Sequence, residues 1–267
     1  MRYASSASLI IAVYKRVDFL ELIFQSIEKQ SYRDFEIIVA EDDCSPSVKE
    51  FVKRWQAKSS FVIKHINQAD EGFRKNKLLN KALSSAQSDY LVFIDGDCIL
   101  HKDFLKEHML LAKPNDCLFG RRVMLDAMTT EKMIKTKSID QLSFFRLLFS
   151  KTRHLENAIH FPFLLSYRKS GVLGCNFSVF KEKLIEINGF DEDFQRPLYG
   201  EDTDIERRLR LIGVQIKNTK FKTIQYHLHH EMKDRDEDWI ISGQLYQKKV
   251  NEGKSFCDNG YIKNNTV

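Results

Sequence analysis

Apolar positions along the first 112 residues follow two alternating patterns. Short unbroken runs of aliphatic and aromatic residues predict buried strands, and the segments between them carry apolar residues at helical spacing. Regular alternation of strand and helix predicts βαβ units, a parallel sheet and right-handed crossovers. The expected strands are 8–14, 35–40, 61–66 and the strand that begins at Tyr90, and the expected helices are 17–29, 47–58 and 73–85.

Beyond residue 103 the alternation stops. Residues 129–168 are basic and aromatic, and we expect an irregular helical insertion that packs on the sheet or covers its rim. The packed helix is the preferred interpretation, although residues 141–168 would also suit contact with a membrane or a lipid-linked substrate. The other expected elements are a helix over 104–112, a short strand within 117–125, a strand over 170–180, a short helix over 181–187, a helix with Ile205, Leu209, Leu211 and Ile212 on its inner face, a strand over 214–223 and a tail that is helical around 238–249.

Size and composition are those of a globular protein with one large domain. The chain has 267 residues, of which 43% are hydrophobic and 30% are charged. The formal net charge of +5 comes from 42 basic and 37 acidic residues. This mild excess suits an anionic ligand and does not indicate nucleic-acid binding.

The cysteines and the apolar runs bear on the compartment. Five scattered cysteines, without metal-ligand spacing, predict reduced thiols in a cytosolic protein. The sequence contains neither a signal peptide pattern nor an apolar run of about 20 residues. We therefore expect a cytoplasmic protein that is at most peripheral at the inner face of the membrane.

Carboxylates follow two of the predicted strands directly. The fourth strand ends in Asp95-Gly96-Asp97, and the second is followed by Asp42-Asp43. The carboxyl ends of strands form the ligand-binding edge of an open α/β sheet, and Gly96 lets the backbone approach a ligand closely. Such oxygen ligands suit Mg²⁺ or Mn²⁺ shared with substrate phosphates. Each cluster alone is also explained as an acidic turn, but two together favour a ligand site.

Two further polar groups occur in the second half of the chain. Three carboxylates fall within residues 201–204, at the expected start of a helix. Helix capping and the helix dipole account for one or two of them, but three exceed what capping requires. Three histidines lie within residues 227–230, a cluster that suits a metal or an anion and that also occurs without function on protein surfaces.

Taken in order, these motifs resemble the family 2 glycosyltransferases with a GT-A fold, in the branch with a galactosyltransferase-like C-terminal half. The resemblance implies an α/β fold with a mixed, mainly parallel sheet flanked by helices. It also implies a domain over 1–232, divided into a nucleotide-binding half (1–112) and an acceptor-binding half (113–232), followed by a tail (233–267). The matching residues are the strand into Tyr14, Glu41-Asp42-Asp43-Cys44-Ser45, Asp70 to Lys77 with Asn80, Asp95-Gly96-Asp97, Gly174-Cys175-Asn176, Asn188 to Glu192, Gly200-Glu201-Asp202 and the histidine group.

The resemblance implies an inverting hexosyltransferase that acts on a UDP-sugar. The donated hexose or N-acetylhexosamine would pass to a hydroxyl of a glycan or lipid-linked acceptor, in cell-surface polysaccharide synthesis. Asp202 would be the general base, with Glu201 beside it binding acceptor or donor sugar. Arg74 and Lys77 would face the diphosphate or ribose. The residues expected to bind the nucleotide-sugar are Ala12, Tyr14, Arg16, Asp42, Asp43, Gly72, Arg74, Lys77, Asp95, Gly96, Asp97 and Asn176.

The resemblance also implies a bound Mn²⁺ or Mg²⁺. Asp97 would bind the metal directly, and Asp95 would face both ribose and metal. His227, with His230 as second choice, would complete the metal shell. The uracil ring would be held by Tyr14 and by Asp42 or Asp43, a choice that the sequence leaves open.

Two alternatives compete with this interpretation. A sugar nucleotidyltransferase would also use a metal on an α/β sheet, but it usually has a glycine-rich loop after its first strand, and residues 12–16 contain no glycine. A non-catalytic carbohydrate- or membrane-binding module would not need every expected carboxylate, and this chain has them all.

Overall fold

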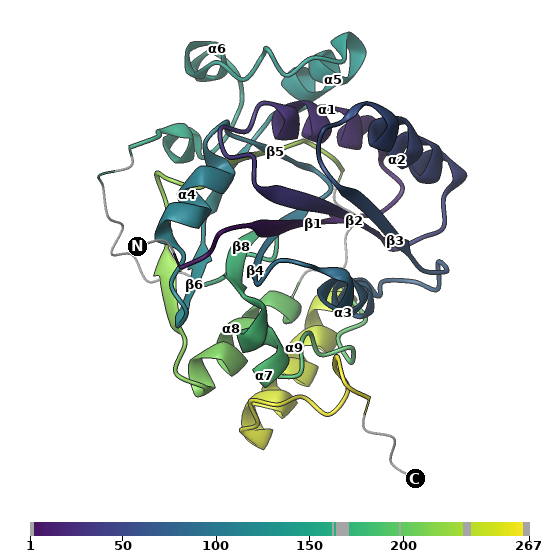
Figure 1. Ribbon diagram of the computed structural model, residues 1–267, viewed down its shortest axis with the longest axis vertical. Coiled ribbons are helices and arrows are strands. Elements are labelled where there is room, and N and C mark those ends of the chain that lie inside the picture. Colours follow the sequence, from purple (N-terminus) through teal and green to yellow (C-terminus); the bar gives the residue numbers. More distant parts are fainter. Residues whose placement is uncertain (1–2, 162, 164–170, 198, 232–235, 264–267) are drawn as a thin grey trace.

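The computed structural model describes residues 3–161, 163, 171–197, 199–231 and 236–263. Its centre is a seven-stranded sheet of order β3-β2-β1-β4-β8-β6-β9 (Figure 1). The first four strands are parallel, and β8 runs antiparallel to both of its neighbours. A second sheet has the order β5-β10-β7. The strands are β1 (Ala7–Val13), β2 (Phe35–Glu41), β3 (Ile63–Asn67), β4 (Tyr90–Asp95), β5 (Cys98–Leu100), β6 (Asp116–Phe119), β7 (Arg121–Met124), β8 (Asn176–Phe180), β9 (Gln215–Asn218) and β10 (Ile224–His227).

Helices cover both faces of the large sheet, with α1 and α2 on one face and α3, α7 and α8 on the other (Figure 1). The insertion places α5 and α6 beyond α1, at the top of the view. Within the described residues, no helix has both the length and the apolar character needed to cross a bilayer. The helices are α1 (Val17–Glu28), α2 (Pro46–Lys58), α3 (Lys75–Ser85), α4 (Phe104–Leu111), α5 (Ala127–Thr136), α6 (Phe144–Leu148), the 3₁₀ helix η1 (Leu155–Ala158), α7 (Lys181–Glu186), α8 (Glu201–Leu211) and α9 (Asp236–Glu252).

The apolar runs form strands because both faces of the sheet are buried. Successive side chains of a strand point to opposite faces, so a strand covered by helices on both sides needs apolar residues at every position. In β1, Leu9 and Ile11 enter the core beneath α1 and α2, whereas Ile10 enters the core beneath α3. In the second core, Phe93 of β4 stacks on Phe177 of β8 with ring centroids 4.5 Å apart. This contact joins the parallel half of the sheet to the rest.

The small sheet brings the acidic end of β4 next to the histidines. Residues 96 and 97 connect β4 to β5, and β5 pairs with β10 so that Cys98 lies opposite His227. The strand β10 also pairs with β7, which leads into the insertion. The backbone amide of His229 donates to Thr130 Oγ1 of α5 at 2.9 Å. The insertion therefore begins directly beside the histidine group.

Most of the expected elements are confirmed with shifts of one or two residues at their ends, but three expectations are wrong. The expected strand over 170–180 begins only at Asn176, since residues 171–175 form a loop and turn, and residue 170 lies outside the described part. The expected strand over 214–223 is instead β9, with the separate strand β10 beginning at Ile224 in the other sheet. Leu211, expected on the inner face of α8, is 52% exposed because it lies in the last turn, beyond the edge of the core.

The remaining expectations have mixed outcomes. All five cysteines lie within the described residues and carry free thiols, as predicted. The insertion is helical and irregular in its described part, and α9 includes the expected helix around 238–249. Residues 162 and 164–168 of the insertion lie outside the described residues, as do 232–235 at the expected domain boundary. That boundary stays a prediction.

Candidate active site

One carboxylate and two histidines meet at the junction of β4, β5 and β10. Asp97 Oδ2 lies 3.2 Å from His227 Nε2 and 3.3 Å from His230 Nε2. Suitable ligand atoms of the three residues all lie within 4.8 Å of one another. Burial would raise the pKa of Asp97, but hydrogen bonds from both histidines outweigh it and hold the pKa below the usual range of a carboxyl. The hydrogen bond to Asp97 in turn raises the pKa of His230.

This group fits a divalent cation. Ligands about 2.1–2.2 Å from an octahedral metal lie about 3 Å apart, close to the distances seen here. The three residues also supply one carboxylate oxygen, a ligand that suits Mn²⁺ and Mg²⁺, and two imidazole nitrogens, which suit transition ions. The Nδ1 atom of His227 is buried without a hydrogen-bond partner among the described residues, and Nε2 points at Asp97. Of the predicted metal ligands, Asp97, His227 and His230 are brought together here, and Asp95 is held by another partner.

That partner is Lys75, the first residue of α3. Its Nζ lies 2.7 Å from Asp95 Oδ1. Burial would lower the pKa of Lys75, but the charges of Asp95 and Glu201 outweigh it and raise the pKa. Lys75 falls within the motif of residues 70–77, in which only Gly72, Arg74 and Lys77 are predicted to contact the ligand. Its position at the start of the helix that leads into β4, the strand ending at Asp95, is the signal that could have identified it.

The two acidic residues at the start of α8 lie on the other side of Lys75. Gly200 begins this helix with φ 102°, and a Cβ there would lie 2.6 Å from the Phe194 ring. Glycine is required because this left-handed conformation is strained for other residues. Gly174 N donates to Asp202 Oδ2 at 3.2 Å. Burial raises the pKa of Glu201 to about 7, partly offset by the charge of Lys75.

A small open hollow lies in front of these groups. Asp95 and Asp97 are two residues apart, so Lys75 connects the hollow to the metal-binding group through its contact with Asp95. The end of β4 and the start of α8 thus lie on two sides of Lys75. The hollow is lined by Lys75, Asn76, Leu79, Val172, Gly174, Phe177, Phe190, Glu201, Asp202 and Ile205.

A second acidic position lies at the end of β2. Gln68 donates to Asp42 Oδ1 at 2.6 Å, and Arg74 N donates to Asp42 Oδ2 at 2.9 Å, so both oxygens of Asp42 have partners. The Oδ1 atom of Asp43 is buried without a partner among the described residues. Burial, together with the charge of Glu41, raises the pKa of Asp43. Asp43 is therefore the better placed of the two to accept a hydrogen bond from a ligand.

The loop after β1 borders the same edge. Tyr14 is half exposed, and its hydroxyl donates to Asp70 Oδ2 at 3.2 Å. Ala12 contributes its carbonyl, which accepts from Gly96 N at 2.7 Å. A Cβ at Gly96 would lie 2.9 Å from that carbonyl, so the close approach of β1 and the 95–97 turn requires glycine. Arg16 forms an ion pair with Asp18 at 2.7 Å.

Four other residues predicted to bind the nucleotide-sugar differ from one another in burial and in their contacts. Asn176 is fully buried, and its amide donates to the carbonyls of Arg121 and Thr223, so this side chain joins strands and is not at the surface of the site. Arg74 pairs with Glu71. Lys77 is partly exposed on α3, and Gly72 occupies an exposed loop with φ 89°.

Arg122 of β7 is a further basic residue that the sequence analysis passed over. Burial would lower its pKa, but nearby Cys175, Cys98, Asp97 and Asp95 raise it. Its Nη1 lies 3.7 Å from Cys175 Sγ. Its signal was weak, because the Arg121-Arg122 pair stands in a short strand whose place beside β10 the sequence does not predict.

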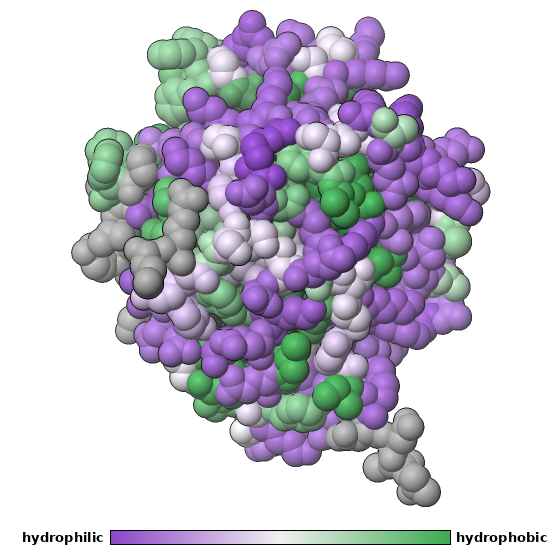
Figure 2. Space-filling view, viewed as in Figure 1, coloured by the Kyte–Doolittle hydropathy of each residue, from purple (hydrophilic) through white to green (hydrophobic). Residues whose placement is uncertain are grey.

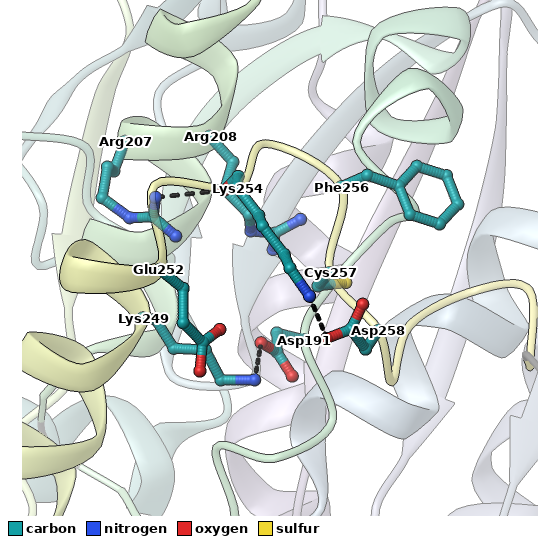
Figure 3. A pocket seen from close by; sticks show the side chains of 9 residues that line it. All are labelled: Asp191, Arg207, Arg208, Lys249, Glu252, Lys254, Phe256, Cys257 and Asp258. Atoms are coloured by element: carbon teal, nitrogen blue, oxygen red, sulfur yellow. Dashed lines mark hydrogen bonds and ion pairs between the residues drawn. The ribbon is translucent and has the colours of Figure 1, made fainter.

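A second small hollow lies between α8, α9 and the segment that follows α9 (Figure 3). Four of its charged side chains form ion pairs with each other. Lys249 Nζ lies 2.8 Å from Asp191 Oδ2, and Lys254 Nζ lies 2.8 Å from Asp258 Oδ2. None of the residues predicted for the site lines this hollow. The first pair attaches α9 to the segment beside Phe190 of the second core, and the second lies within the segment that follows α9.

Solved structures of similar shape define the class of fold. TarS of Staphylococcus aureus in complex with UDP-GlcNAc superposes with a TM-score of 0.61 and 17% identity, over 92% of this chain and 66% of that one. A mannosyltransferase from Pyrobaculum calidifontis, in complex with GDP-Man and Mn²⁺, gives a TM-score of 0.62 and 18% identity, over 94% and 66%. At such identities the likeness shows the fold alone, and that fold is the GT-A fold.

The sequence comparison gives the family. Residues 8–174 match the sequence model of Glycosyl transferase family 2, and residues 153–231 match the one described as the N-terminal domain of galactosyltransferase. The first match covers more than half of the chain, so the chain belongs to glycosyl transferase family 2.

Curated relatives are longer than this chain. The GalNAc(5)-diNAcBac-PP-undecaprenol beta-1,3-glucosyltransferase of Campylobacter jejuni is 27% identical over 197 residues, which are 70% of this chain and 55% of that enzyme. The putative teichuronic acid biosynthesis glycosyltransferase TuaG of Bacillus subtilis is 22% identical over 171 residues, which are 63% and 59%. The matched region thus spans little more than half the length of these relatives.

Proposed function

We propose that this protein is a metal-dependent, inverting glycosyltransferase that transfers a sugar from a UDP-sugar to a hydroxyl group. The observation that carries the proposal is that Lys75 lies between two groups of polar side chains. On one side Asp97, His227 and His230 converge on a point suited to a cation, and on the other Glu201 and Asp202 border a hollow. Family membership and the fold support the same activity.

The residues divide between the departing and the attacking groups. Asp97, His227 and His230 would hold Mn²⁺ or Mg²⁺, which when bound neutralises negative charge on the leaving diphosphate. Lys75 is a fixed cation at the same edge and would donate to phosphate oxygens. Asp202 accepts the proton of the acceptor hydroxyl as its oxygen attacks the anomeric carbon. The bond to the diphosphate breaks in the same step, so the configuration inverts without a covalent intermediate.

The nucleotide would lie across the ends of β1 and β2. Asp43 offers a buried carboxylate oxygen that has no partner among the described residues, which suits the N–H of a uracil ring. Tyr14 is exposed beside it and offers a ring for stacking. Arg74 and Lys77 lie at the start of α3, on the side where the ribose and diphosphate would extend. This assigns the base contact to Asp43 and leaves Asp42 to hold the loop through Gln68 and Arg74.

The acceptor is proposed to be a glycan or a lipid-linked saccharide of a cell-surface polysaccharide. The name of the Campylobacter jejuni relative describes an undecaprenol-linked acceptor, and that of TuaG describes teichuronic acid biosynthesis. An enzyme with such an acceptor works at the cytoplasmic face of a membrane. The chain itself offers a surface for this contact.

That surface is the aromatic group on and beside α6, which comprises Phe144, Phe145, Leu148 and Phe149. Figure 2 shows hydrophobic residues gathered at the upper left, where Figure 1 places α6. Phe145 is 76% exposed and Phe149 is 89% exposed. Arg146 and Lys151 accompany them in sequence, and cationic residues around exposed aromatics suit an anionic lipid surface.

We expect Phe145→Ser with Phe149→Ser to reduce binding to vesicles that contain anionic lipid at least tenfold. The two rings would no longer enter the lipid interface, whereas the fold should persist because both side chains are exposed. Co-sedimentation with phosphatidylglycerol vesicles measures the effect. Val62→Ser, a change of an exposed apolar residue outside the insertion, is the control. Unchanged vesicle binding of the double variant would exclude this surface as the membrane contact.

The donor assignment is tested by calorimetry and a donor screen. We expect UDP to bind at least tenfold more tightly with Mn²⁺ than with a chelator, because the metal-binding group stands beside the diphosphate position. A screen of UDP-sugars for metal-dependent hydrolysis would then identify the donor without an acceptor. Release of pyrophosphate from a nucleoside triphosphate and a sugar phosphate would point to a nucleotidyltransferase. Absence of any metal-enhanced UDP binding would refute the proposal.

A further inference from the structure

A second group of metal-ligating side chains lies at the opposite end of β5 and β10 from the active site. It comprises His101, Asp103 and His160, whose candidate ligand atoms all lie within 4.8 Å of one another. The rings of His101 and His160 have centroids 4.8 Å apart. Nothing in the proposed transfer reaction uses these residues. They come from three separate elements, the end of β5, the start of α4 and the segment after η1.

Hydrogen bonds indicate where the lone pair of each ring lies. Glu107 is 5% exposed, and its Oε1 lies 3.3 Å from His160 Nε2. A carboxylate is an acceptor, so in the neutral ring it holds the proton on Nε2 and leaves the lone pair on Nδ1. The lone pair of His101 is on Nδ1, where it accepts a 3.2 Å hydrogen bond from Asp103 N, and a bound ion would take the place of this hydrogen bond. A carboxylate behind a ligating histidine is the usual second contact in zinc sites.

The carboxylate of Asp103 supplies the negative charge of the group. Ser31 Oγ donates to its Oδ1 at 2.7 Å, and Lys106 Nζ lies 3.8 Å from the same oxygen. Among the described residues both of these contacts involve Oδ1, which leaves Oδ2 for an ion.

We propose that His101, Asp103 and His160 form a second cation site, for a transition ion such as Zn²⁺. Two imidazoles and one carboxylate are the donors that Zn²⁺ takes in three-ligand sites, with water in the fourth position. Tetrahedral ligands about 2.1 Å from the ion lie about 3.4 Å apart, so the three side chains draw together when the ion binds.

The position of the site gives the ion a structural role. His101 N donates to the carbonyl of Ile224 at 3.0 Å, so His101 is fixed to β10. His160 belongs to the insertion, and Phe161 N donates to the carbonyl of Phe221 at 2.8 Å. A bound ion would thus tie the end of the insertion to α4 and to the small sheet that ends at His227. The site is independent of the proposed reaction and is tested without donor or acceptor.

Zinc stoichiometry separates the two sites. The full chain, freed of metal and carrying Cys44→Ser to remove an exposed thiol, is dialysed against Zn²⁺ at neutral pH. We expect this protein to bind two ions. The His160→Gln and His227→Gln variants should each bind one, and the variant with both changes should hold none tightly. His154→Gln, a change of an exposed histidine in the same insertion, should retain two. Far-ultraviolet circular dichroism confirms folding, and Asp103→Asn replaces His160→Gln if that variant does not fold.

Cobalt supplies a second readout. In the His227→Gln protein, Co²⁺ should give the visible absorption of a four-coordinate site, and Asp103→Asn should abolish it. Zn²⁺ should raise the melting temperature of the His227→Gln protein and leave that of the double variant unchanged. One bound ion that disappears with His227→Gln, and no change on substituting His160 or Asp103, would overturn the second site and leave the proposed transferase intact.

Discussion

Asp97→Asn is expected to lower metal-dependent transfer by about a thousandfold or more. The substitution keeps the size of the side chain but removes the only negative charge among the three residues of the metal-binding group. A cation at the leaving diphosphate stabilises the transition state by several kcal/mol, and each 1.36 kcal/mol corresponds to about a tenfold change in rate. Initial rates of UDP release, measured over a series of Mn²⁺ concentrations, give the size of the loss.

The same variant should also lose the metal enhancement of UDP binding. Asp140→Asn, which removes a carboxylate that is 73% exposed, is the matched control and should behave as the unmodified chain does. His230→Gln should cause a smaller loss than Asp97→Asn, because it removes one neutral ligand and leaves the charge. Wild-type rates in Asp97→Asn, with UDP binding still enhanced by Mn²⁺, would show that the cation binds elsewhere.

The core of the fold could be predicted because its strands are buried on both faces. The strands β1, β2 and β4 each contain at least four successive apolar residues, and no helical spacing competes with that signal. The acidic residues after β2 and β4 follow from the same logic, since parallel strands end at one edge. The small sheet could not be predicted in this way. Its strands are three or four residues long, too short for a periodic pattern.

Three features of the site depend on contacts between distant residues. The proposed role of Lys75 depends on its contact with Asp95, and the sequence does not predict that contact. Asp42 and Asp43 are adjacent and chemically identical, and only the partners Gln68 and Arg74 distinguish them. Asn176 matches a family motif, yet it is buried between strands and donates to two backbone carbonyls. A motif predicts the neighbourhood of a residue, and the packing around it decides what its side chain contacts.

Asp202→Asn is expected to lower kcat by about 10²–10⁴-fold and leave UDP-sugar binding unchanged. The amide cannot accept a proton from the acceptor hydroxyl, and general-base assistance is worth about that factor. The fold should persist, because the asparagine carbonyl can still accept the hydrogen bond from Gly174 N. Single-turnover transfer to an acceptor, together with calorimetry of donor binding, separates the chemical step from binding.

Glu201→Gln is the matched comparison, because Glu201 is the neighbouring carboxylate at the start of the same helix. Burial raises the pKa of Glu201 to about 7, so this side chain is protonated below neutral pH and ionised above it. Its replacement should remove any inflection near pH 7 from the pH–rate profile and cost less activity than Asp202→Asn. If Glu201→Gln instead causes the larger loss of kcat while Asp202→Asn stays active, Glu201 is the base. Its raised pKa would then suit it to accept a proton near neutral pH.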